Sequence, residues 1–358
     1  MNRVQRRTFA AIFGVFVLGT LVGCVSSPAE SSAGTIGLLL PEAGVSRYET
    51  SDRPVFEEVV AKRCPECDLL YANAGSSAAR QQEQAEAMLA RGVDVIVLDA
   101  VDTVAAESIV AEASRHGADV IAYDRFIDHP DVDIYVSFDS ELIGRIQADA
   151  VVAALPSEAG DLPGILLVHG SPTDPNAAAL RAGVHDALEG ANVEILGEFD
   201  APAWSSTQAQ EWVSGQLTQF PGRVDGIVAA NDALAGGAIA ALKAAGVDPV
   251  PPVSGQDGEL SAIQRIVDGN QLMTVAKATD DQARTAAEIA VRLLRGEEPA
   301  APSMILGVPS FVLAPTAVEQ SDIERVIVQG RVHSVEAICT PDYADACVRI
   351  GLIDKEIP

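Results

Sequence analysis

Residues 93–125 read VDVIVLDAVDTVAAESIVAEASRHGADVIAYDR, and they contain the unit that recurs along the chain. The apolar runs at 93–98 and 120–123 are typical of buried strands. Between them, residues 105–116 have the spacing of an amphipathic helix, which stops at Gly117. A strand, a helix and a second strand in this order predict a parallel sheet that is covered by helices.

The alternation of strands and helices continues along most of the chain. It starts with an apolar run at 35–40, restarts with a helix at 141–155 and stays clear until about residue 294. We therefore predict an α/β protein with two doubly wound parallel-sheet lobes, because two lobes fit this count of strands better than one very wide sheet. The expected lobes are 35–139 with 277–306, and 140–276 with 307–358.

The N-terminus has the features of an export signal rather than of a folded element. Arg3, Arg6 and Arg7 precede an apolar run at 9–23 that is too short for an ordinary membrane-spanning helix. We therefore predict a signal peptide at 1–23. The adjacent arginines also resemble a weak twin-arginine signal, so the general secretory route and the twin-arginine route both stay open.

The predicted signal ends in Leu-Val-Gly-Cys at 21–24, which resembles the lipobox of bacterial lipoproteins. In such proteins a peptidase cuts before the cysteine, and lipid is attached to its thiol. Cys24 is therefore the expected lipidation site, and the small polar residues 24–34 are the expected lipid-anchored linker. The alternative is an ordinary signal peptide in which the cysteine occurs by chance.

The chain of 358 residues is strongly acidic, with a formal net charge of −27. Removal of the predicted signal would take away three arginines and no acidic residue, which changes −27 to −30. Such a surface repels nucleic acids and anionic lipids, so no nucleic acid is expected as a partner. The charge also argues against an anionic ligand, although most of these acidic residues need no role beyond solubility.

Four further cysteines form two close pairs, Cys64 with Cys67 and Cys339 with Cys347. Export permits disulfides, and the short separations favour pairing within each couple. The first pair also has the Cys-x-x-Cys spacing of redox enzymes, but it follows a predicted helix instead of preceding one. We expect structural disulfides, with a catalytic dithiol or free thiols as the alternatives. The five histidines are scattered without ligand spacing, so no metal site is predicted.

Polar, charged and aromatic residues follow almost every predicted strand. The carboxyl ends of parallel strands meet at one edge of a sheet, and the ligands of open α/β sheets bind there. These positions therefore predict a binding cleft between the lobes. The candidate ligand-binding residues are Arg47, Tyr48, Asp124, Arg125, Asn176, Trp204, Asn231, Asp257 and Lys277.

This set of side chains suits a sugar. The carboxylates of Asp124 and Asp257 accept hydrogen bonds from hydroxyl groups, whereas arginine and lysine donate them and asparagine does both. Tyr48 and Trp204 offer flat apolar faces for the C–H side of a sugar ring. Plainer interpretations also exist, with Asp124 as half of a loop ion pair and Trp204 as a core residue.

At these positions the chain resembles the periplasmic sugar-binding proteins of the ribose and xylose type, and most closely the D-xylose-binding proteins of ABC transporters. The resemblance covers most of the chain between residues 37 and 291. It implies the type I periplasmic binding protein fold with a three-segment hinge, and the nine candidates as ligand contacts. The motifs that carry it include Gly37-Leu38-Leu39-Leu40-Pro41, Val120-Ile121-Ala122-Tyr123-Asp124-Arg125, Val136-Ser137-Phe138-Asp139, Gly170-Ser171-Pro172, Asn231-Asp232-Ala233 and Ser254-Gly255-Gln256-Asp257.

The resemblance implies a monomeric binding protein that captures a monosaccharide, with D-xylose favoured, and delivers it to the permease of an ABC transporter. The lipid anchor would hold it on the outer face of the cytoplasmic membrane or in the periplasm, and no cofactor is expected. The alternative is a sensor that presents xylose, ribose, arabinose or a hexose to a membrane receptor kinase. An enzyme is not expected, because the sequence lacks Gly-x-Gly-x-x-Gly, Walker and Gly-x-Ser-x-Gly motifs.

Overall fold

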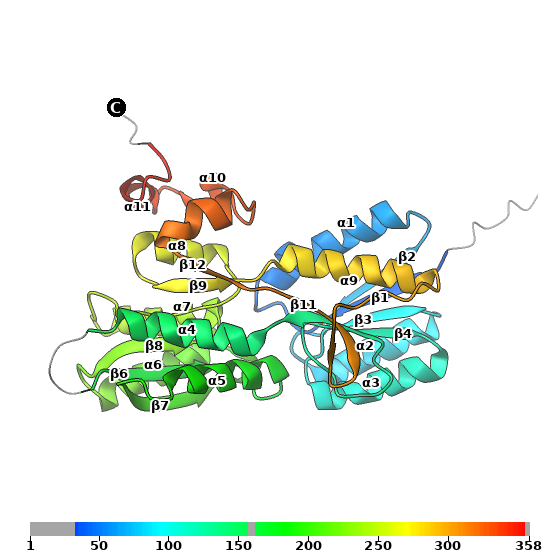
Figure 1. Cartoon of the computed structure of the whole chain (residues 1–358), viewed down its shortest axis with the longest axis horizontal. Helices are drawn as coiled ribbons and strands as arrows, with labels where there is room; N and C mark the ends of the chain where they lie inside the picture. Colours follow the sequence, from blue (N-terminus) through cyan, green and yellow to red (C-terminus); the bar gives the residue numbers. More distant parts are fainter. Residues whose placement is uncertain (1–32, 157–161, 355–358) are drawn as a thin grey trace, which may run out of the picture. The chain divides into compact units, whose positions relative to one another are not determined.

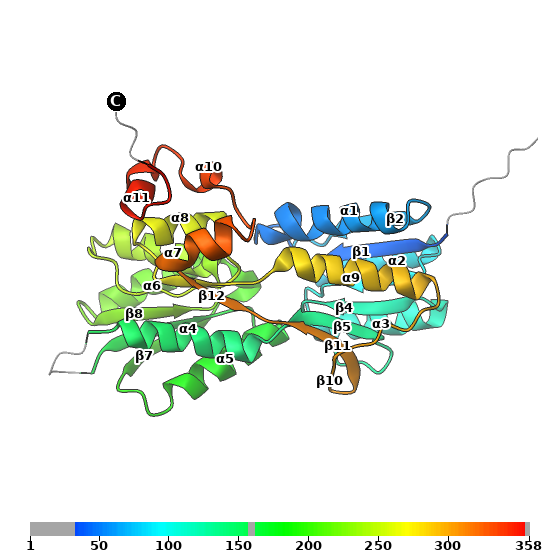
Figure 2. The same cartoon turned by 45° about the horizontal axis from the view of Figure 1, so that its top comes forward.

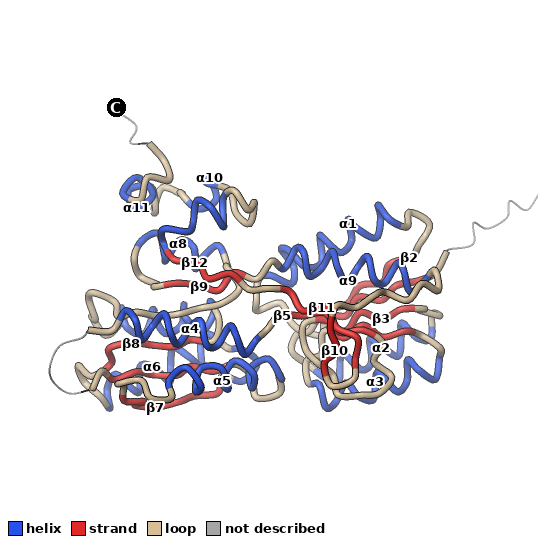
Figure 3. The backbone as a smooth tube through the Cα atoms, in the orientation of Figure 1, coloured by secondary structure: helices blue, strands red, loops and turns tan. Residues whose placement is uncertain are grey.

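The computed structural model describes residues 33–156 and 162–354. The predicted signal peptide, Cys24 and most of the predicted linker lie outside the described residues. Within the described ranges, no helix combines the length and the apolar character that crossing a membrane requires. Figure 3 shows two groups of strands in this part of the chain, and helices surround each group.

The first lobe is built on a seven-stranded sheet in the order β10-β11-β5-β4-β3-β1-β2. Neighbouring strands are parallel except for β10 and β11, which form an antiparallel hairpin. Helices α1 and α9 cover one face of this sheet, and α2 and α3 cover the other (Figure 1). The strands are β1 (Thr35–Leu40), β2 (Asp68–Asn73), β3 (Val95–Leu98), β4 (Asp119–Tyr123), β5 (Ile134–Phe138), β10 (Ser303–Ile305) and β11 (Val308–Leu313). The helices are α1 (Arg53–Arg63), α2 (Ala78–Ala90), α3 (Thr103–His116) and α9 (Thr279–Leu294).

The strand–helix–strand unit at 93–125 forms as predicted, as β3, α3 and β4. Helix α3 begins after Asp102, whose Oδ1 accepts hydrogen bonds from the backbone N–H groups of Val104 and Ala105, both at 3.0 Å. The helix ends at Gly117, whose φ of 74° lies in the left-handed region that favours glycine. Its apolar stripe is buried against the sheet, which fixes the helix on that face.

The second lobe contains a three-stranded sheet in the order β7-β6-β8 and a two-stranded sheet of β12 and β9. Isolated parallel bridges, Ile227 with Val253 and Gln256 with Val275, connect the two. Helix α4 packs against α5, and α6 packs against α7 (Figure 2). The strands are β6 (Gly164–His169), β7 (Glu194–Asp200), β8 (Val224–Ala229), β9 (Met273–Ala276) and β12 (Thr316–Glu319). The helices are α4 (Ser140–Ala154), α5 (Pro175–Leu188), α6 (Ser206–Gln219), α7 (Asp232–Ala244) and α8 (Leu260–Asp268).

Within residues 33–156 and 162–354, the chain crosses between the lobes three times. It leaves the first lobe between β5 and α4, at Asp139, and it returns between β9 and α9, at Lys277 and Ala278. Both positions agree with the sequence-based boundaries near 139 and 277. The third crossing lies between β11 and β12. The three crossings give the fold the three-segment hinge that the resemblance implies.

The predicted third boundary, between residues 306 and 307, is wrong. Residues 308–313 form β11, which pairs in parallel with β5 in the sheet of the first lobe. Only the next strand, β12, pairs with β9 in the second lobe. Hydrogen bonding to β5 therefore keeps this segment in the first lobe, and the chain changes lobe at residues 314–315.

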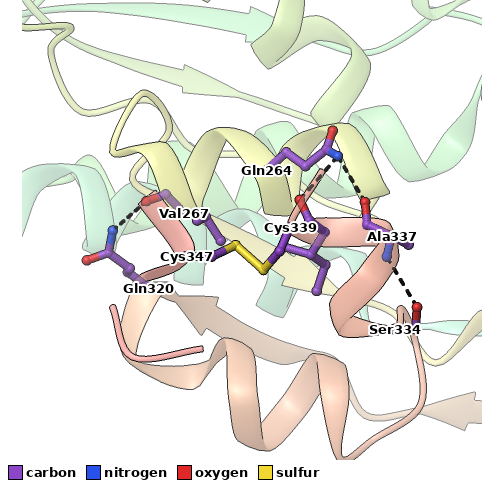
Figure 4. Close-up of a disulfide and its surroundings, with 8 residues drawn as sticks. Gln264, Val267, Gln320, Ser334, Ala337, Cys339 and Cys347 are labelled. Atoms are coloured by element: carbon purple, nitrogen blue, oxygen red, sulfur yellow. Dashed lines mark hydrogen bonds between the residues drawn. A yellow bond between two sulfur atoms is a disulfide. The ribbon is translucent and has the colours of Figure 1, made fainter. Parts of the chain in front are cut away.

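The residues after β12 form a small subdomain on α8, made of η3 (Gln320–Asp322), η4 (Ile323–Val328), α10 (Val335–Ile338) and α11 (Ala344–Arg349). A disulfide between Cys339 and Cys347 closes it (Figure 4). Gln264 on α8 donates a hydrogen bond of 3.1 Å to a carbonyl oxygen of α10. The structure also contains the other predicted disulfide, Cys64–Cys67, directly after α1.

Candidate binding site between the lobes

A polar cavity lies between the two lobes, with an empty volume of about 370 Å³ that includes the part open to solvent. Its wall contains all nine residues proposed from the sequence, namely Arg47, Tyr48, Asp124, Arg125, Asn176, Trp204, Asn231, Asp257 and Lys277. Four further residues complete the wall: Val45, Ser140, Asp174 and Gln256.

The fold explains why residues far apart in the sequence meet here. Asp124 follows β4, Asn231 follows β8, and Lys277 follows β9. Each of these strands runs toward the cavity, so its carboxyl end delivers the next side chains to the wall. Arg47 and Tyr48 lie at the start of the short π-helix η1, in the segment that follows β1.

The backbone of Asp124 contacts both lobes. Its φ of 63° lies in the left-handed region, which residues other than glycine rarely adopt. In this conformation its carbonyl oxygen accepts hydrogen bonds from Ser137 Oγ (2.6 Å) and from Asn176 Nδ2 (2.9 Å). Asn176 belongs to α5 of the second lobe, so a single backbone oxygen joins the two lobes at the cavity.

The carboxylate of Asp124 is surrounded by donors. Its Oδ1 accepts hydrogen bonds from Arg47 Nη1 (3.3 Å) and Gln282 Nε2 (3.2 Å), and Lys277 Nζ lies 3.8 Å away. Burial by itself would raise the pKa of Asp124. The positive charges of Lys277, Arg47 and Arg125 outweigh burial, and they lower this pKa well below its ordinary value. Asp124 is therefore a stable anion in the cavity wall.

Arg47 is held in place by a second carboxylate behind the cavity. Its Nε and Nη2 donate to the two oxygens of Asp52 at 2.8 and 2.7 Å. Nη2 also donates to Gln282 Oε1 at 2.7 Å. The hydroxyl of Tyr123 donates to the same carboxylate of Asp52. This paired geometry fixes the guanidinium plane and directs Nη1 toward Asp124.

Arg125 connects the two lobes by ion pairs with a carboxylate of each lobe. Its Nε lies 2.8 Å from Asp174 Oδ2 of the second lobe and 3.4 Å from Asp99 Oδ1 of the first. Both are ion-pair contacts without hydrogen-bond alignment. Its Nη1 donates to the carbonyl oxygen of Ala100 (2.7 Å), and its Nη2 donates to the hydroxyl of Tyr48 (3.3 Å). Burial raises the pKa of Asp99 well above its ordinary value.

Two aromatic side chains are fixed at the cavity. Tyr48 and Trp204 are only 3% and 8% exposed, and both line the wall. The indole Nε1 of Trp204 donates to Asp174 Oδ2 at 3.1 Å. A Cβ atom at Gly170 would lie 2.2 Å from Cη2 of the indole, so only glycine leaves room for the ring in this position.

Lys277, Asp257 and Asn231 supply the remaining polar atoms. Lys277 Nζ lies 3.0 Å from Asp257 Oδ1. Asn231 Oδ1 caps α7 by accepting a hydrogen bond of 2.9 Å from the backbone N–H of Leu234. Among the described residues, none accepts a hydrogen bond from the side-chain amide of Asn231. That amide can therefore donate to a ligand while the oxygen caps the helix.

The charges of the wall cancel. The cations are Arg47, Arg125 and Lys277, and an equal number of carboxylates belongs to Asp124, Asp174 and Asp257. Because each cation has a carboxylate within ion-pair distance, a neutral ligand leaves no buried charge unpaired. The arrangement suits a small, neutral molecule with several hydroxyl groups and one apolar face.

The nine candidates named from the sequence did not include the four additional wall residues. Asp174 looks like an ordinary helix cap, because its Oδ1 accepts a hydrogen bond of 2.9 Å from the backbone N–H of Asn176. Ser140, the first residue of α4, donates to Asn176 Oδ1 at 3.1 Å. One feature of the sequence could have indicated that Asp174 lines the wall. It lies between β6 and α5, two residues before the candidate Asn176. Its contacts with Arg125 and Trp204 depend on packing that the sequence does not display.

Two α/β lobes with three crossings and a polar cavity between them define the class of two-lobed solute-binding proteins. Residues 36–298 match the family described as "Periplasmic binding protein domain", and the chain belongs to this family. The predicted fold class and the predicted family resemblance are confirmed.

The chain is similar to two D-xylose-binding periplasmic proteins. The one from Haemophilus influenzae is 35% identical over 330 residues, which are 89% of this chain and 97% of that protein. The one from Escherichia coli is 35% identical over 310 residues, 83% of this chain and 90% of that protein. A solved structure of an ABC transporter solute-binding protein from Clostridium phytofermentans, with bound β-D-glucose, has a TM-score of 0.78 at 22% identity. The structural alignment covers 85% of this chain and 99% of the solved chain. At 22% identity, this similarity supports the fold and nothing further.

Proposed function

We propose that this chain is an extracytoplasmic solute-binding protein that captures a monosaccharide and delivers it to an ABC transporter. D-xylose is the favoured sugar. The observation that carries the proposal is the cavity between the lobes, whose wall offers cancelling charges and two aromatic side chains. The two D-xylose-binding relatives, each 35% identical over most of the chain, support the choice of sugar.

The wall provides the contacts that a sugar ring needs. The carboxylates of Asp124 and Asp257 accept hydrogen bonds from hydroxyl groups, and the amide of Asn231 and the ammonium of Lys277 donate them. The indole of Trp204 offers an apolar surface to ring C–H groups. These donors and acceptors are already held by the protein, so little side-chain entropy is lost when the sugar binds.

Closure of the lobes is the proposed mechanism. Direct contacts between residues 124–125 and 174–176 already link the lobes beside the cavity: Arg125 with Asp174, and Asn176 with Asp124. A further hydrogen bond of 3.3 Å runs from Thr173 Oγ1 to the carbonyl oxygen of a first-lobe loop. A sugar that contacts both walls binds the closed form better than the open form and shifts the population toward it. The transporter then receives the closed protein.

No reaction on the sugar is proposed. A glycosidase needs one carboxyl group that stays protonated as the general acid. The lowered pKa of Asp124 keeps that group ionised, and the Oδ1 of Asp257 lies 3.0 Å from the ammonium of Lys277. The Asp124 carboxylate is therefore suited to accepting hydrogen bonds rather than to donating a proton.

The proposal includes a lipid anchor at Cys24, which would keep the protein beside its permease. The lipobox-like residues 21–24 support this part. In a Cys24→Ala variant the thiol that would carry the lipid is absent, so the variant should not be labelled by radioactive palmitate, whereas the wild type should be. Equal palmitate labelling of the variant and the wild type would contradict the anchor.

The function is tested by calorimetric titration of the full chain, purified in detergent, against D-xylose, D-ribose, L-arabinose, D-glucose and D-galactose. We expect micromolar or tighter binding of one sugar per chain, with D-xylose the tightest. Asp257→Asn should weaken binding by about 10- to 100-fold, the effect of losing a hydrogen bond to a charged group.

Asp342→Asn, which changes an exposed carboxylate in the C-terminal subdomain, is the matched control and should bind as the wild type does. A different tightest sugar would correct the ligand and keep the site. Absence of heat with every sugar would refute sugar capture.

A further inference from the structure

A second cluster of chemically reactive side chains lies in the second lobe, at residues that do not line the cavity. It consists of His169 at the end of β6, His185 on α5 and Glu198 on β7. None of the three lines the sugar cavity. Their ligand atoms all lie within 4.8 Å of one another.

The spacing of these atoms matches a metal site. Nε2 of His169 and Nε2 of His185 each lie 3.2 Å from Oε2 of Glu198. Around a tetrahedral Zn²⁺ with metal–ligand distances of about 2.0–2.1 Å, neighbouring ligand atoms are roughly 3.3–3.4 Å apart. Both His–Glu distances are thus close to those around a tetrahedral Zn²⁺, and all three ligand atoms lie within 4.8 Å of one another. Water would complete the coordination.

The three side chains differ in exposure in a way that suits capture from solution. The side chain of His169 is 4% exposed and is fixed by the fold, whereas that of His185 is 42% exposed and that of Glu198 is 27% exposed. One ligand is thus preorganised, and the other two leave a path for the ion to enter.

In this structure the guanidinium of Arg181 provides the positive charge that pairs with Glu198 of the cluster. Its Nη2 donates to the same Glu198 Oε2 at 2.7 Å, while its Nη1 contacts the two oxygens of Asp200 at 2.9 and 3.1 Å. A metal ion would take over the charge of Glu198, and Arg181 would keep its paired contact with Asp200. Arg181 is therefore a competitor for the site.

We propose that His169, His185 and Glu198 form a binding site for a divalent transition-metal ion, with Zn²⁺ as the natural probe. Two imidazoles and a carboxylate favour Zn²⁺ over Mg²⁺ or Ca²⁺, which prefer oxygen ligands. The sequence pattern gave no metal prediction, because the ligands are 13 to 29 residues apart and come from three elements. The site is independent of the proposed sugar binding.

The test is calorimetric titration of Zn²⁺ into the full chain, which is purified without a polyhistidine tag and dialysed against chelator and then against buffer. We expect one ion per chain with micromolar or tighter affinity. His185→Ala should weaken this binding by at least about tenfold, because one of three ligands is lost. Arg181→Gln should strengthen it, because the positive charge that repels the metal ion is gone.

His116→Ala is the matched control, because it removes an exposed histidine that lies 3.7 Å from Glu112 on α3 of the other lobe. It should leave Zn²⁺ binding unchanged. The proposal is overturned if the wild type binds no Zn²⁺, if His185→Ala binds it as the wild type does, or if Mg²⁺ binds equally well. Circular dichroism of each variant establishes that a lost signal does not reflect unfolding.

Discussion

At the scale of single residues, the binding site is a set of charges that stabilise one another before any ligand arrives. Asp124 contacts Arg47 and Lys277, Lys277 also contacts Asp257, and Arg125 pairs with a carboxylate of the other lobe. Removing one member leaves a buried partner unpaired, which costs more than the loss of a surface ion pair. Stability and sugar affinity should therefore respond together to changes in this network.

The lowered pKa of Asp124 leads to a prediction about pH. The folded pKa of this group lies below its ordinary value of 3.8, so its stabilising contribution is present above about pH 4 and is lost only as pH falls through the lower folded pKa. Asp124→Asn should destabilise the fold by about 3–5 kcal/mol at neutral pH. Urea unfolding of wild type and variant should show the same difference at pH 7, 5.5 and about 4.5.

Asp131→Asn, at an exposed position on the loop between β4 and β5, should show no such difference at any of these pH values. If the stability gap of Asp124→Asn closes between pH 7 and 5, the carboxyl group is protonated in the folded protein, and the electrostatic account of the site is wrong.

The contact between Gly170 and Trp204 gives a steric prediction. An added Cβ at Gly170 would lie 2.2 Å from the indole, so Gly170→Ala must displace the ring. We expect sugar affinity to fall by at least about tenfold and stability by about 1–3 kcal/mol, the usual cost of overpacking. Calorimetry and urea unfolding measure the two effects.

Gly215→Ala is the control for this substitution, because a Cβ at this position on α6 meets no atom within 4 Å. It should leave sugar affinity unchanged and slightly stabilise the helix. Equal sugar binding by Gly170→Ala and the wild type would show that the position of Trp204 does not matter for the ligand.

The sequence allowed nine wall residues to be predicted because their position after strands follows directly from the periodic pattern. Asp174 was not predicted as a wall residue, because capping α5 already accounts for an aspartate at that position. Its second role depends on Arg125 and Trp204, which lie 49 and 30 residues away in the chain and meet it only through folding. A local sequence pattern does not reveal that one residue has two roles.

At the scale of elements, the strongly periodic helices and strands of both lobes were predictable, whereas the segments after α9 were not. Strands β10, β11 and β12 have three to six residues each and no helical partner to give them a repeating pattern. β11 forms part of the first sheet because it pairs with β5, which lies more than 170 residues earlier. The misplaced lobe boundary follows from this long-range pairing.

The C-terminal subdomain gives a prediction at this scale. Its disulfide, Cys339–Cys347, closes a short loop beside α8. A Cys339→Ser/Cys347→Ser variant should lose about 2–3 kcal/mol of stability, as the chain-entropy estimate for a loop of this length gives. Sugar affinity should stay within about twofold of the wild type, since neither cysteine lines the cavity.

Limited proteolysis should show that the loss is local, with early cleavage after residue 320 in the variant and not in the wild type. Cys64→Ser/Cys67→Ser is the matched control, because its disulfide lies in the other lobe and should leave the C-terminal cleavage pattern unchanged. A large fall in sugar affinity in the C-terminal variant would mean that the subdomain shapes the cavity directly.

At the scale of the whole molecule, two lobes and three crossings place one wall of the cavity on each lobe. The sequence predicted two lobes from the restart of the strand–helix pattern near residue 141, and the family match confirms the predicted fold class. The contacts that hold the lobes together, such as Asn176 with the carbonyl oxygen of Asp124, could not be predicted. They depend on how far the lobes close, which no local pattern encodes.

The most direct test of sugar capture between the lobes uses the fluorescence of Trp204. The chain has two tryptophans, and the other, Trp212, stacks on Phe199 with ring centroids 5.4 Å apart, away from the cavity wall. In a Trp212→Phe variant, Trp204 is the sole emitter. Titration with D-xylose should change its emission saturably, with the Kd that calorimetry gives. Sugar binding by calorimetry without any change in this emission would place the ligand elsewhere and contradict the account.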